Sequence, residues 1–296
     1  MSFPAPTATY HHKPYPTIDP TRPELSAKGK SIVVTGGGTG IGAEIARYFA
    51  KAGASRILII GRRESPLITT KASIEKDFPA VDVSYASADA TKKSEIDAAF
   101  ASFAKDVKIN VLVSNAGVLG NRSSIRDANI DKWFSGIETN LKGSFTVAQS
   151  FLGHAAPESV LINVSSAVAH FNVNHDGSSY AVAKAAGIRF FSALAHEHPE
   201  LTIYNLQPGM VITDMAKEAG FGVDGVELTE EQKVLEQMVD EVTLPAAFTV
   251  WLASPEARFL KGKFVWSNWD IEELRARKTE IEGGLLDIGL VGWPFA

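Results

Sequence analysis

The chain alternates between short runs that are apolar at nearly every position and longer stretches with helical character. We expect β-strands at Ser31–Gly36, Arg56–Gly61, Val81–Asp89, Asn110–Gly117, Ser159–Ser166, Leu201–Gly209 and Gly262–Asn268. Most of these runs are apolar on successive residues, which is typical of strands covered on both faces. The alternation predicts right-handed crossovers and an α/β fold with one doubly wound, mostly parallel, seven-stranded sheet that carries helices on both faces.

Residues 1–29 lie outside this alternation. They are polar and rich in proline, which interrupts helices, so we expect an extended N-terminal arm. His11 and His12 are adjacent, which is not the spacing of metal ligands on a helix, and we interpret them as part of a solvated tail. Residues 30–296 show no internal repeat and no break in composition, so we expect them to form a single domain.

The segment 213–244 interrupts the rhythm of that domain. It begins with mixed polar and glycine residues and continues with the helical pattern "TEEQKVLEQMVDEV". An insertion after the sixth strand lies at the carboxyl end of the sheet, where ligands bind in such folds. We expect a lid over the bound ligand, and the alternative is a static surface helix that only packs against the sheet.

Composition narrows the class of partner. The 296 residues are 45% hydrophobic and 21% charged, with a formal net charge of -5 and no run of Lys or Arg. This argues against a nucleic acid or an anionic membrane as partner. No apolar stretch approaches the roughly 20 residues that cross a bilayer. The chain has no cysteine, which excludes disulfides and thiolate chemistry and favours a cytoplasmic location.

A glycine-rich turn follows the first strand directly, in "TGGGTGIGAEIARYFA". Gly36, Gly40 and Gly42 would let the backbone turn tightly and approach a pyrophosphate, while the next helix offers its N-terminal N–H groups to the phosphate charge. The setting between a strand and a helix favours a dinucleotide site over an ordinary turn.

The end of the second strand indicates which dinucleotide. An NAD site places Asp or Glu there to accept a hydrogen bond from the 2′-hydroxyl of the ribose. This chain has Gly61 followed by Arg62 and Arg63. A guanidinium can bind a 2′-phosphate with two parallel hydrogen bonds, so NADP(H) is favoured over NAD(H). Arg62 is the first choice because it directly follows the strand, and the alternative is a solvated loop in which Glu64 pairs with either arginine.

Tyr180 and Lys184 lie four positions apart in "SSYAVAKAAG" and would share one face of a helix. A phenol has a pKa of about 10, and a nearby cation lowers it toward the range useful for proton transfer. Taken alone, the pair is better explained by a lysine that extends beside a half-buried tyrosine, because this spacing often occurs by chance. Its significance depends on the remaining motifs.

Six features occur in order along the chain: "TGGGTGIG", "NAG" at 115–117, Asn140, the serine pair Ser165–Ser166, Tyr180 with Lys184, and "PGMVIT" at 208–213. Together they resemble the short-chain dehydrogenase/reductase family over about Lys30 to Asn268. The resemblance implies a Rossmann-type sheet, an NAD(P) cofactor and an Asn140–Ser166–Tyr180–Lys184 site. The arm and the tail "FLKGKFVWSNWDIEEL" are similar to fungal members, which often act in secondary metabolism.

By the same resemblance, Asp89 would hold the adenine edge, Asn115 would line the cofactor cleft and Thr213 would hold the nicotinamide carboxamide. The full set implied for cofactor binding is Gly36, Thr39, Gly40, Ile41, Arg62, Arg63, Asp89, Asn115, Gly117, Tyr180, Lys184, Pro208, Gly209, Val211 and Thr213.

The chain departs from the family pattern in two places. Ser114 stands where the family usually has Asn before "NAG". The loop from the serine pair to Tyr180 is one residue longer than is common, so counting back from Tyr180 reaches Ala167, which cannot donate a hydrogen bond. Alignment on the strand end gives Ser166 instead, with Ser165 as the alternative, because loops absorb insertions more readily than strands.

These motifs predict an NADP-dependent oxidoreductase that interconverts a ketone and a secondary alcohol, with Tyr180 as general acid and base. The alternatives are a non-redox isomerase or cyclase on the same fold, and a dinucleotide-sensing regulator. The expected partner is a small-molecule carbonyl or alcohol. We expect a homodimer or homotetramer by resemblance, and no histidine–carboxylate spacing suggests a metal.

Overall fold

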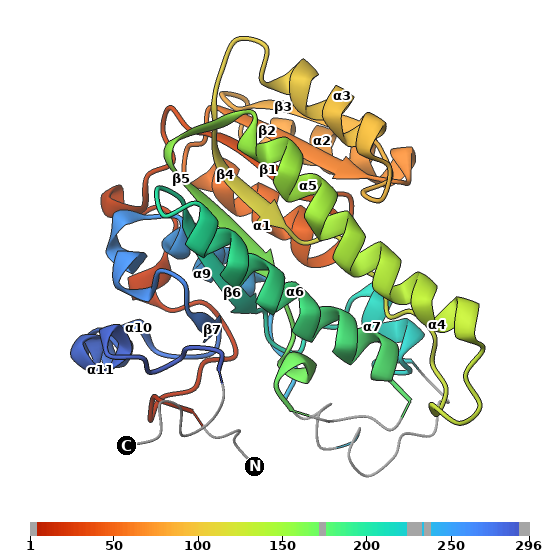
Figure 1. Ribbon diagram of the computed structural model, residues 1–296. Coiled ribbons are helices and arrows are strands. Elements are labelled where there is room, and N and C mark those ends of the chain that lie inside the picture. The colour runs from red at the N-terminus through yellow and green to blue at the C-terminus, as the bar shows by residue number, and fades with distance from the viewer. Residues whose placement is uncertain (1–4, 172–175, 224–232, 234–237, 290–296) are drawn as a thin grey trace.

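One parallel sheet of seven strands lies at the centre of the computed structural model, which describes residues 5–171, 176–223, 233 and 238–289 (Figure 1). The strands follow the order β3-β2-β1-β4-β5-β6-β7. Their bounds are β1 Ser31–Thr35, β2 Arg56–Gly61, β3 Asp82–Ser87, β4 Ile109–Ser114, β5 Ala155–Val164, β6 Thr202–Gln207 and β7 Phe264–Trp266. Every neighbouring pair is parallel, so the predicted doubly wound sheet is confirmed. β5 begins before the predicted apolar run because Ala155 pairs with Ile109 across a register shift.

Helices cover both faces of the sheet and explain the continuous apolar strands. On β1, Ile32 and Val34 belong to one buried cluster and Val33 to the other. The first cluster includes side chains of α1 (Gly40–Lys51), α2 (Glu64–Asp77) and α9 (Thr243–Leu252). The second includes side chains of α3 (Lys93–Phe103), α5 (Gly143–Leu152) and α6 (Ser178–Glu197). The remaining described helices and helical turns are η1 Pro16–Ile18, η2 Pro23–Leu25, α4 Ile130–Ile137, η3 Glu138–Lys142, η4 Ala167–Ala169, α7 Asp214–Glu218, η5 Pro255–Leu260, α10 Ile271–Ala276 and α11 Lys278–Glu282.

The strand order reverses at β1, which pairs with β2 on one side and with β4 on the other. In open sheets of this kind the loops after two such strands run in opposite directions and leave a crevice at their carboxyl ends. The glycine-rich turn after β1 and the "NAG" segment after β4 therefore meet at one place in the fold.

The N-terminal arm packs onto the domain instead of extending into solvent. Each of the two 3₁₀ turns η1 and η2 begins at a proline, and they carry the fully buried Ile18 and the almost fully buried Leu25. His11 bonds to Asp270 at 2.9 Å and His12 to Asp240 at 2.6 Å. The interpretation of these histidines as a solvated tail is therefore wrong, because proline prevents a long helix but not short turns that direct apolar side chains inward. Figure 1 shows the red arm beside the blue C-terminal elements.

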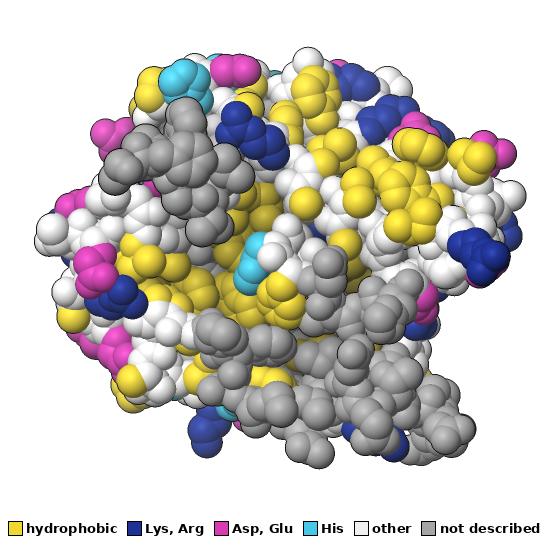
Figure 2. All heavy atoms as spheres, turned by 60° about the horizontal axis from the view of Figure 1, so that its bottom comes forward, with side chains coloured by type: hydrophobic (Ala, Val, Ile, Leu, Met, Phe, Trp, Pro, Cys, Tyr) yellow, Lys and Arg dark blue, Asp and Glu magenta, His cyan; other side chains and the backbone are white. Residues whose placement is uncertain are grey.

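The insertion after β6 is described only in part. It begins with the short helix α7, and the helix expected within "TEEQKVLEQMVDEV" falls mainly on 229–232 and 234–237, which lie outside the described residues. The lid over the site stays a prediction. Figure 2 brings this end of the molecule toward the viewer and shows hydrophobic side chains in a hollow. Within the described ranges, no helix has the length and apolar character needed to cross a membrane.

Candidate active site

The glycine-rich turn brings two stretches of backbone into contact that side chains would separate. A Cβ atom at Gly42 would lie 2.3 Å from the carbonyl oxygen of Gly36, and Gly36 itself has a φ of +67°. Any larger residue at either position would therefore displace the turn. The close approach leaves the start of α1 open toward the cleft beside it, as a bound pyrophosphate requires.

A cleft of about 650 Å³ runs from this turn past the ends of β2, β4 and β5 to α6 and the β6 loop. Most of the predicted cofactor residues line it, namely Gly36, Thr39, Gly40, Ile41, Arg62, Arg63, Asp89, Asn115, Gly117, Tyr180, Lys184, Pro208 and Thr213. Gly209, Val211, Asn140 and Ser166 are not among the lining residues. The volume and the glycine backbone fit a dinucleotide.

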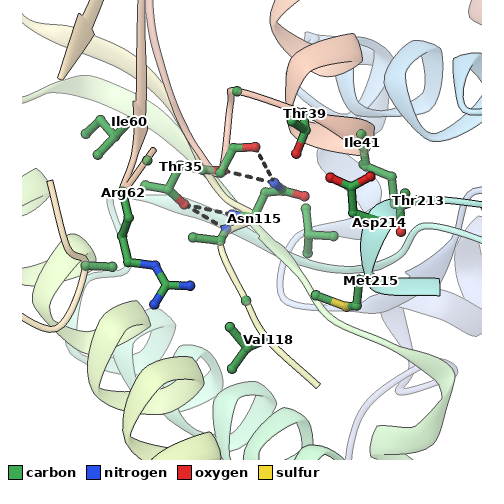
Figure 3. Close-up of a pocket in the computed structure, with 18 of the residues that line it drawn as sticks. Thr35, Thr39, Ile41, Ile60, Arg62, Asn115, Val118, Thr213, Asp214 and Met215 are labelled. Atoms are coloured by element: carbon green, nitrogen blue, oxygen red, sulfur yellow. Dashed lines mark hydrogen bonds between the residues drawn. The ribbon is translucent and has the colours of Figure 1, made fainter. Parts of the chain in front are cut away.

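Asn115 ties the ends of β1 and β4 together (Figure 3). Its side-chain amide donates to the carbonyl oxygen of Thr35 at 2.9 Å, and the Thr35 hydroxyl accepts from the backbone N–H groups of Asn115 and Ala116, both at 3.0 Å. The crevice at the strand reversal is therefore held by hydrogen bonds across the strand ends as well as by packing. Thr35 was missed in the sequence analysis, and its signal was a polar residue at the end of an apolar strand.

Three charged side chains lie close to the end of β2. Arg62 and Arg63 are exposed and line the cleft, and Asp89 lies beside them after β3. Arg63 approaches Asp214 of α7 at 3.5 Å, whereas the described part of the chain gives the Arg62 guanidinium no close ion pair. Hydrogen bonds from Thr91 lower the pKa of Asp89, and the charge of Arg62 adds to this effect. Among the described residues, the Arg62 guanidinium therefore lies at the cleft without a close ion pair and can approach an anionic group there.

Tyr180 and Lys184 project from α6 into the same cleft, close to the end of β5. The side chain of Ser166 lies close enough to the Tyr180 hydroxyl to lower the pKa of the phenol. The ammonium of Lys184 donates to the carbonyl oxygen of Val164 at 2.8 Å and lies 5.5 Å from the centre of the Tyr180 ring. The structure therefore brings Ser166, and not Ser165, against the phenol. The Ser165 hydroxyl is buried and has no hydrogen-bond partner among the described residues.

Asn140 lies in a π-helical turn, Glu138–Lys142, between α4 and α5. Its side chain accepts from the N–H of Val118 at 3.1 Å and donates to the carbonyl oxygens of Val118 and Gly136 at 2.9 and 2.8 Å. A Cβ atom at Gly117 would lie 2.8 Å from Asn140 Oδ1 and 3.7 Å from Lys184 Nζ. Asn140 thus fixes the loop after β4 next to Lys184, and such turns often occur at functional sites.

Burial dominates the titration of the tyrosine–lysine pair. It raises the pKa of Tyr180 to about 12 against the smaller opposing effect of the Ser166 hydrogen bond, and it lowers the pKa of Lys184 to about 8. The expectation that Lys184 lowers the pKa of Tyr180 is not met in this structure, because the ammonium lies over the ring and bonds to Val164 instead of the phenol oxygen. Oxidised nicotinamide would add a positive charge and favour the phenolate.

Comparison with known proteins agrees with this arrangement. The sequence model of the family described as "short chain dehydrogenase" matches residues 30–222, which is more than half of the chain. The chain belongs to the short-chain dehydrogenase family.

Two curated fungal relatives extend the similarity along almost the whole chain. A short chain dehydrogenase/reductase of Claviceps purpurea is 33% identical over 98% of this chain and 96% of its own length. The short chain dehydrogenase pigC of Monascus ruber is 32% identical over 94% of this chain and 91% of its own length. The match includes the arm and the C-terminal elements that lie outside the family model.

Solved structures share the fold. A short chain dehydrogenase from Burkholderia cenocepacia in complex with NADP is 23% identical, with a TM-score of 0.69 over 81% of this chain and 96% of its own. L-sorbose reductase from Gluconobacter frateurii, complexed with NADPH and L-sorbose, is 24% identical, with a TM-score of 0.73 over 82% of this chain and 96% of its own.

Several residues that line the cleft of this dehydrogenase belong to none of the motifs found in the sequence. Asp214 and Met215 line it from α7, and Pro66 and Leu67 line it from α2. The Thr213 hydroxyl accepts from the N–H of Ala216 and caps α7, so its position depends on the helix that follows it. Among the described residues, no group of three or more His, Asp or Glu is placed to hold a metal ion.

The lowered pKa of Lys184 predicts a pH-dependent stability effect. Because the folded-state pKa is about 8 and the ordinary value is 10.5, unfolding takes up a proton between these values, and stability rises with pH across that window. Lys184→Met removes the titrating group. We therefore expect the difference in melting temperature, variant minus wild type, to be highest near pH 7 and to decrease toward pH 10, because only the wild type gains stability across this window. Scanning calorimetry at both pH values checks this, and an equal difference at both would contradict it.

Proposed function

We propose that this short-chain dehydrogenase is an NADP-dependent oxidoreductase that interconverts a ketone and a secondary alcohol. The observation that carries the proposal is that Tyr180, with Ser166 beside its hydroxyl, and Lys184 line the same cleft as the glycine turn and Arg62. The glycine turn, Arg62 and the other cleft residues would hold a dinucleotide in the cleft that Tyr180 also lines. When bound, it would supply or accept the hydride.

Tyr180 is the proton donor in the reducing direction. Its raised pKa keeps the phenol protonated at neutral pH, which is the state needed to protonate the carbonyl oxygen. Ser166 lies beside the Tyr180 hydroxyl. Its own hydroxyl donates a second hydrogen bond to the carbonyl oxygen of the substrate as negative charge develops there. In the oxidising direction the phenol must first lose its proton, so a high pH favours alcohol oxidation.

Lys184 and Asn140 serve Tyr180 without contacting the carbonyl. Lys184 has a pKa of about 8, so it can exchange protons with solvent near neutral pH and restore the proton that Tyr180 donates. Asn140 holds the loop that carries Gly117 and Val118 against Lys184. Replacing Asn140 would therefore move the neighbours of Lys184.

Tyr180→Phe removes the phenolic proton and little else. We expect turnover to fall by about 10²- to 10⁴-fold, since a positioned acid commonly contributes this much, while NADPH binding is retained. Tyr48→Phe is the control, because Tyr48 lies on α1 away from the cleft lining. Steady-state rates and fluorescence titration with NADPH check both variants. Wild-type turnover in folded Tyr180→Phe would rule out this mechanism.

The preference for NADPH over NADH is the second part of the proposal. Gly61 leaves the end of β2 without a carboxylate, and the Arg62 guanidinium is available at the cleft. Two solved structures that share this fold are complexes with NADP or NADPH, which supports the preference.

Arg62→Ala should narrow that preference. Loss of one charge-assisted hydrogen bond to phosphate costs about 1.5–3 kcal/mol, and NADH affinity should change little. Arg63→Ala is the matched comparison, since Arg63 approaches Asp214. Titration of both cofactors against the three proteins decides the matter. Tighter NADH binding by wild type would contradict the preference, and an effect of Arg63→Ala alone would transfer the role to Arg63.

The alternative functions explain less of the site. A dinucleotide-sensing regulator has no need for Ser166 beside the Tyr180 hydroxyl and Lys184 over the Tyr180 ring. An isomerase or cyclase could use them, but a group that protonates a carbonyl oxygen beside a dinucleotide cleft matches hydride chemistry more directly. Conversion of a substrate with no net oxidation of NADPH would favour the isomerase.

We also propose that the enzyme is a cytoplasmic homodimer or homotetramer of fungal secondary metabolism. Relatives from fungi match the arm and the C-terminal segment.

The oligomeric state is supported by an apolar groove of about 590 Å³ between the α4–α5 region and α6. It is lined by Ile137, Leu141, Phe145 and Phe190, and Phe145 is 48% exposed. A second copy would cover it. Sedimentation equilibrium should give two or four times the 31.8 kDa of one chain, and a mass of one chain would contradict the proposal.

A further inference from the structure

Asp240 is a carboxylate in the protein interior, three residues before α9, and it lies outside the cleft lining. It is only 4% exposed. Its Oδ2 atom accepts from the backbone N–H of Met210 at 2.7 Å. Its Oδ1 atom accepts from the side-chain amide of Asn268 at 2.9 Å and lies 2.6 Å from Nδ1 of His12. Burial raises the pKa of Asp240, and these hydrogen bonds oppose that rise.

Three segments that are distant in sequence meet at this carboxylate. Backbone hydrogen bonds join them as well: Asp240 N–H donates to Met210, Glu241 N–H donates to His12, and His11 N–H donates to Asn268, at 2.7, 2.9 and 2.7 Å. The arm therefore lies between the chain that enters α9 and the chain that leaves β7. Helix α9 is almost entirely buried, so Asp240 is attached to a rigid base.

The loop after β6 fits closely onto Asp240. Gly209 has a φ of +94°, and a Cβ atom there would lie 2.3 Å from Asp240 Oδ2. Only glycine permits this approach without strain or displacement. The carboxylate thus accepts a hydrogen bond from the N–H of Met210 and packs closely against Gly209.

The same loop supplies two walls of the cleft. Pro208 precedes the turn and Thr213 follows it, and both line the cleft. Thr213 also touches the glycine-rich turn, since its Cγ2 atom lies 3.1 Å from the Cβ position of Gly40. A displacement of the Gly209–Met210 turn would therefore be passed to both ends of the loop at the dinucleotide site.

We propose that Asp240 is a positioning residue of the cofactor cleft, which fixes the 208–213 loop and depends on His12 of the N-terminal arm to complete its contacts. The inference rests on the proposed function, because the cleft is taken to hold NADP(H). It gives the arm a role in cofactor binding that its distance along the chain from the cleft motifs does not suggest.

Two substitutions break this junction and one serves as control. His12→Ala removes the contact of the arm with Asp240, and the His12 side chain is 47% exposed, so the protein should fold. Asp240→Asn keeps the shape but places an amide where one of the accepting oxygens was. Arg22→Ala breaks a different contact of the arm, the ion pair with Glu256 at 2.9 Å, which does not involve the β6 loop.

The full-length proteins are compared by NADPH fluorescence titration and by amide hydrogen exchange of 209–213 without cofactor. Because couplings between linked sites are commonly about fivefold or more, we expect His12→Ala and Asp240→Asn to weaken NADPH binding by at least that factor. Both should also speed exchange in this loop. Arg22→Ala should lower the melting temperature and change neither quantity.

Two outcomes would overturn the inference. One is wild-type affinity and exchange in His12→Ala, and the other is an equal loss of affinity in Arg22→Ala, which would show only that a loosened arm destabilises the domain. If wild-type protein did not bind NADPH, the proposed function would fail, and the exchange comparison would still decide whether the arm fixes the loop.

Discussion

The hydrogen bonds between Asn115 and Thr35 are the constraint on which the rest of the site depends. They close the gap between β1 and β4 at the point where the strand order reverses. The Asn115 amide also lies 2.5 Å from the Cβ position of Gly42, so the glycine turn, the strand ends and the "NAG" segment can only be assembled together. The residues beyond this junction, including Lys184 next to Gly117, take their places relative to it.

A second junction, at Asp240, holds another wall of the cleft. The first junction is built from strand ends and is local to the sheet, whereas the second gathers the arm, the β6 loop and the exit of β7. Buried carboxylates are costly, and their retention is best understood when they fix one arrangement among several. In this protein that arrangement is the path of the loop between Pro208 and Thr213.

The sheet was predictable because most of its strands are apolar on both faces, a pattern that few other structures produce. Ser166 was also predicted, since the strand end located it although the loop count reached Ala167. The docking of the arm was not, because "TIDP" and "PELS" show no periodicity and only the tertiary structure reveals that Ile18 and Leu25 are buried. Nor could spacing foresee that Lys184 bonds to Val164, since the effect of a cation on a phenol depends on burial and direction as well as proximity.

Transfer of hydride beside Tyr180 is the central claim, and isotopic labelling tests it most directly. The protein would be incubated with a panel of ketones and NADPH that carries deuterium at both C4 positions of the dihydronicotinamide, and the products analysed by mass spectrometry. The account predicts a secondary alcohol with deuterium on the carbinol carbon, formed in step with oxidation of the cofactor. A product that forms without deuterium, or without loss of NADPH, would contradict it.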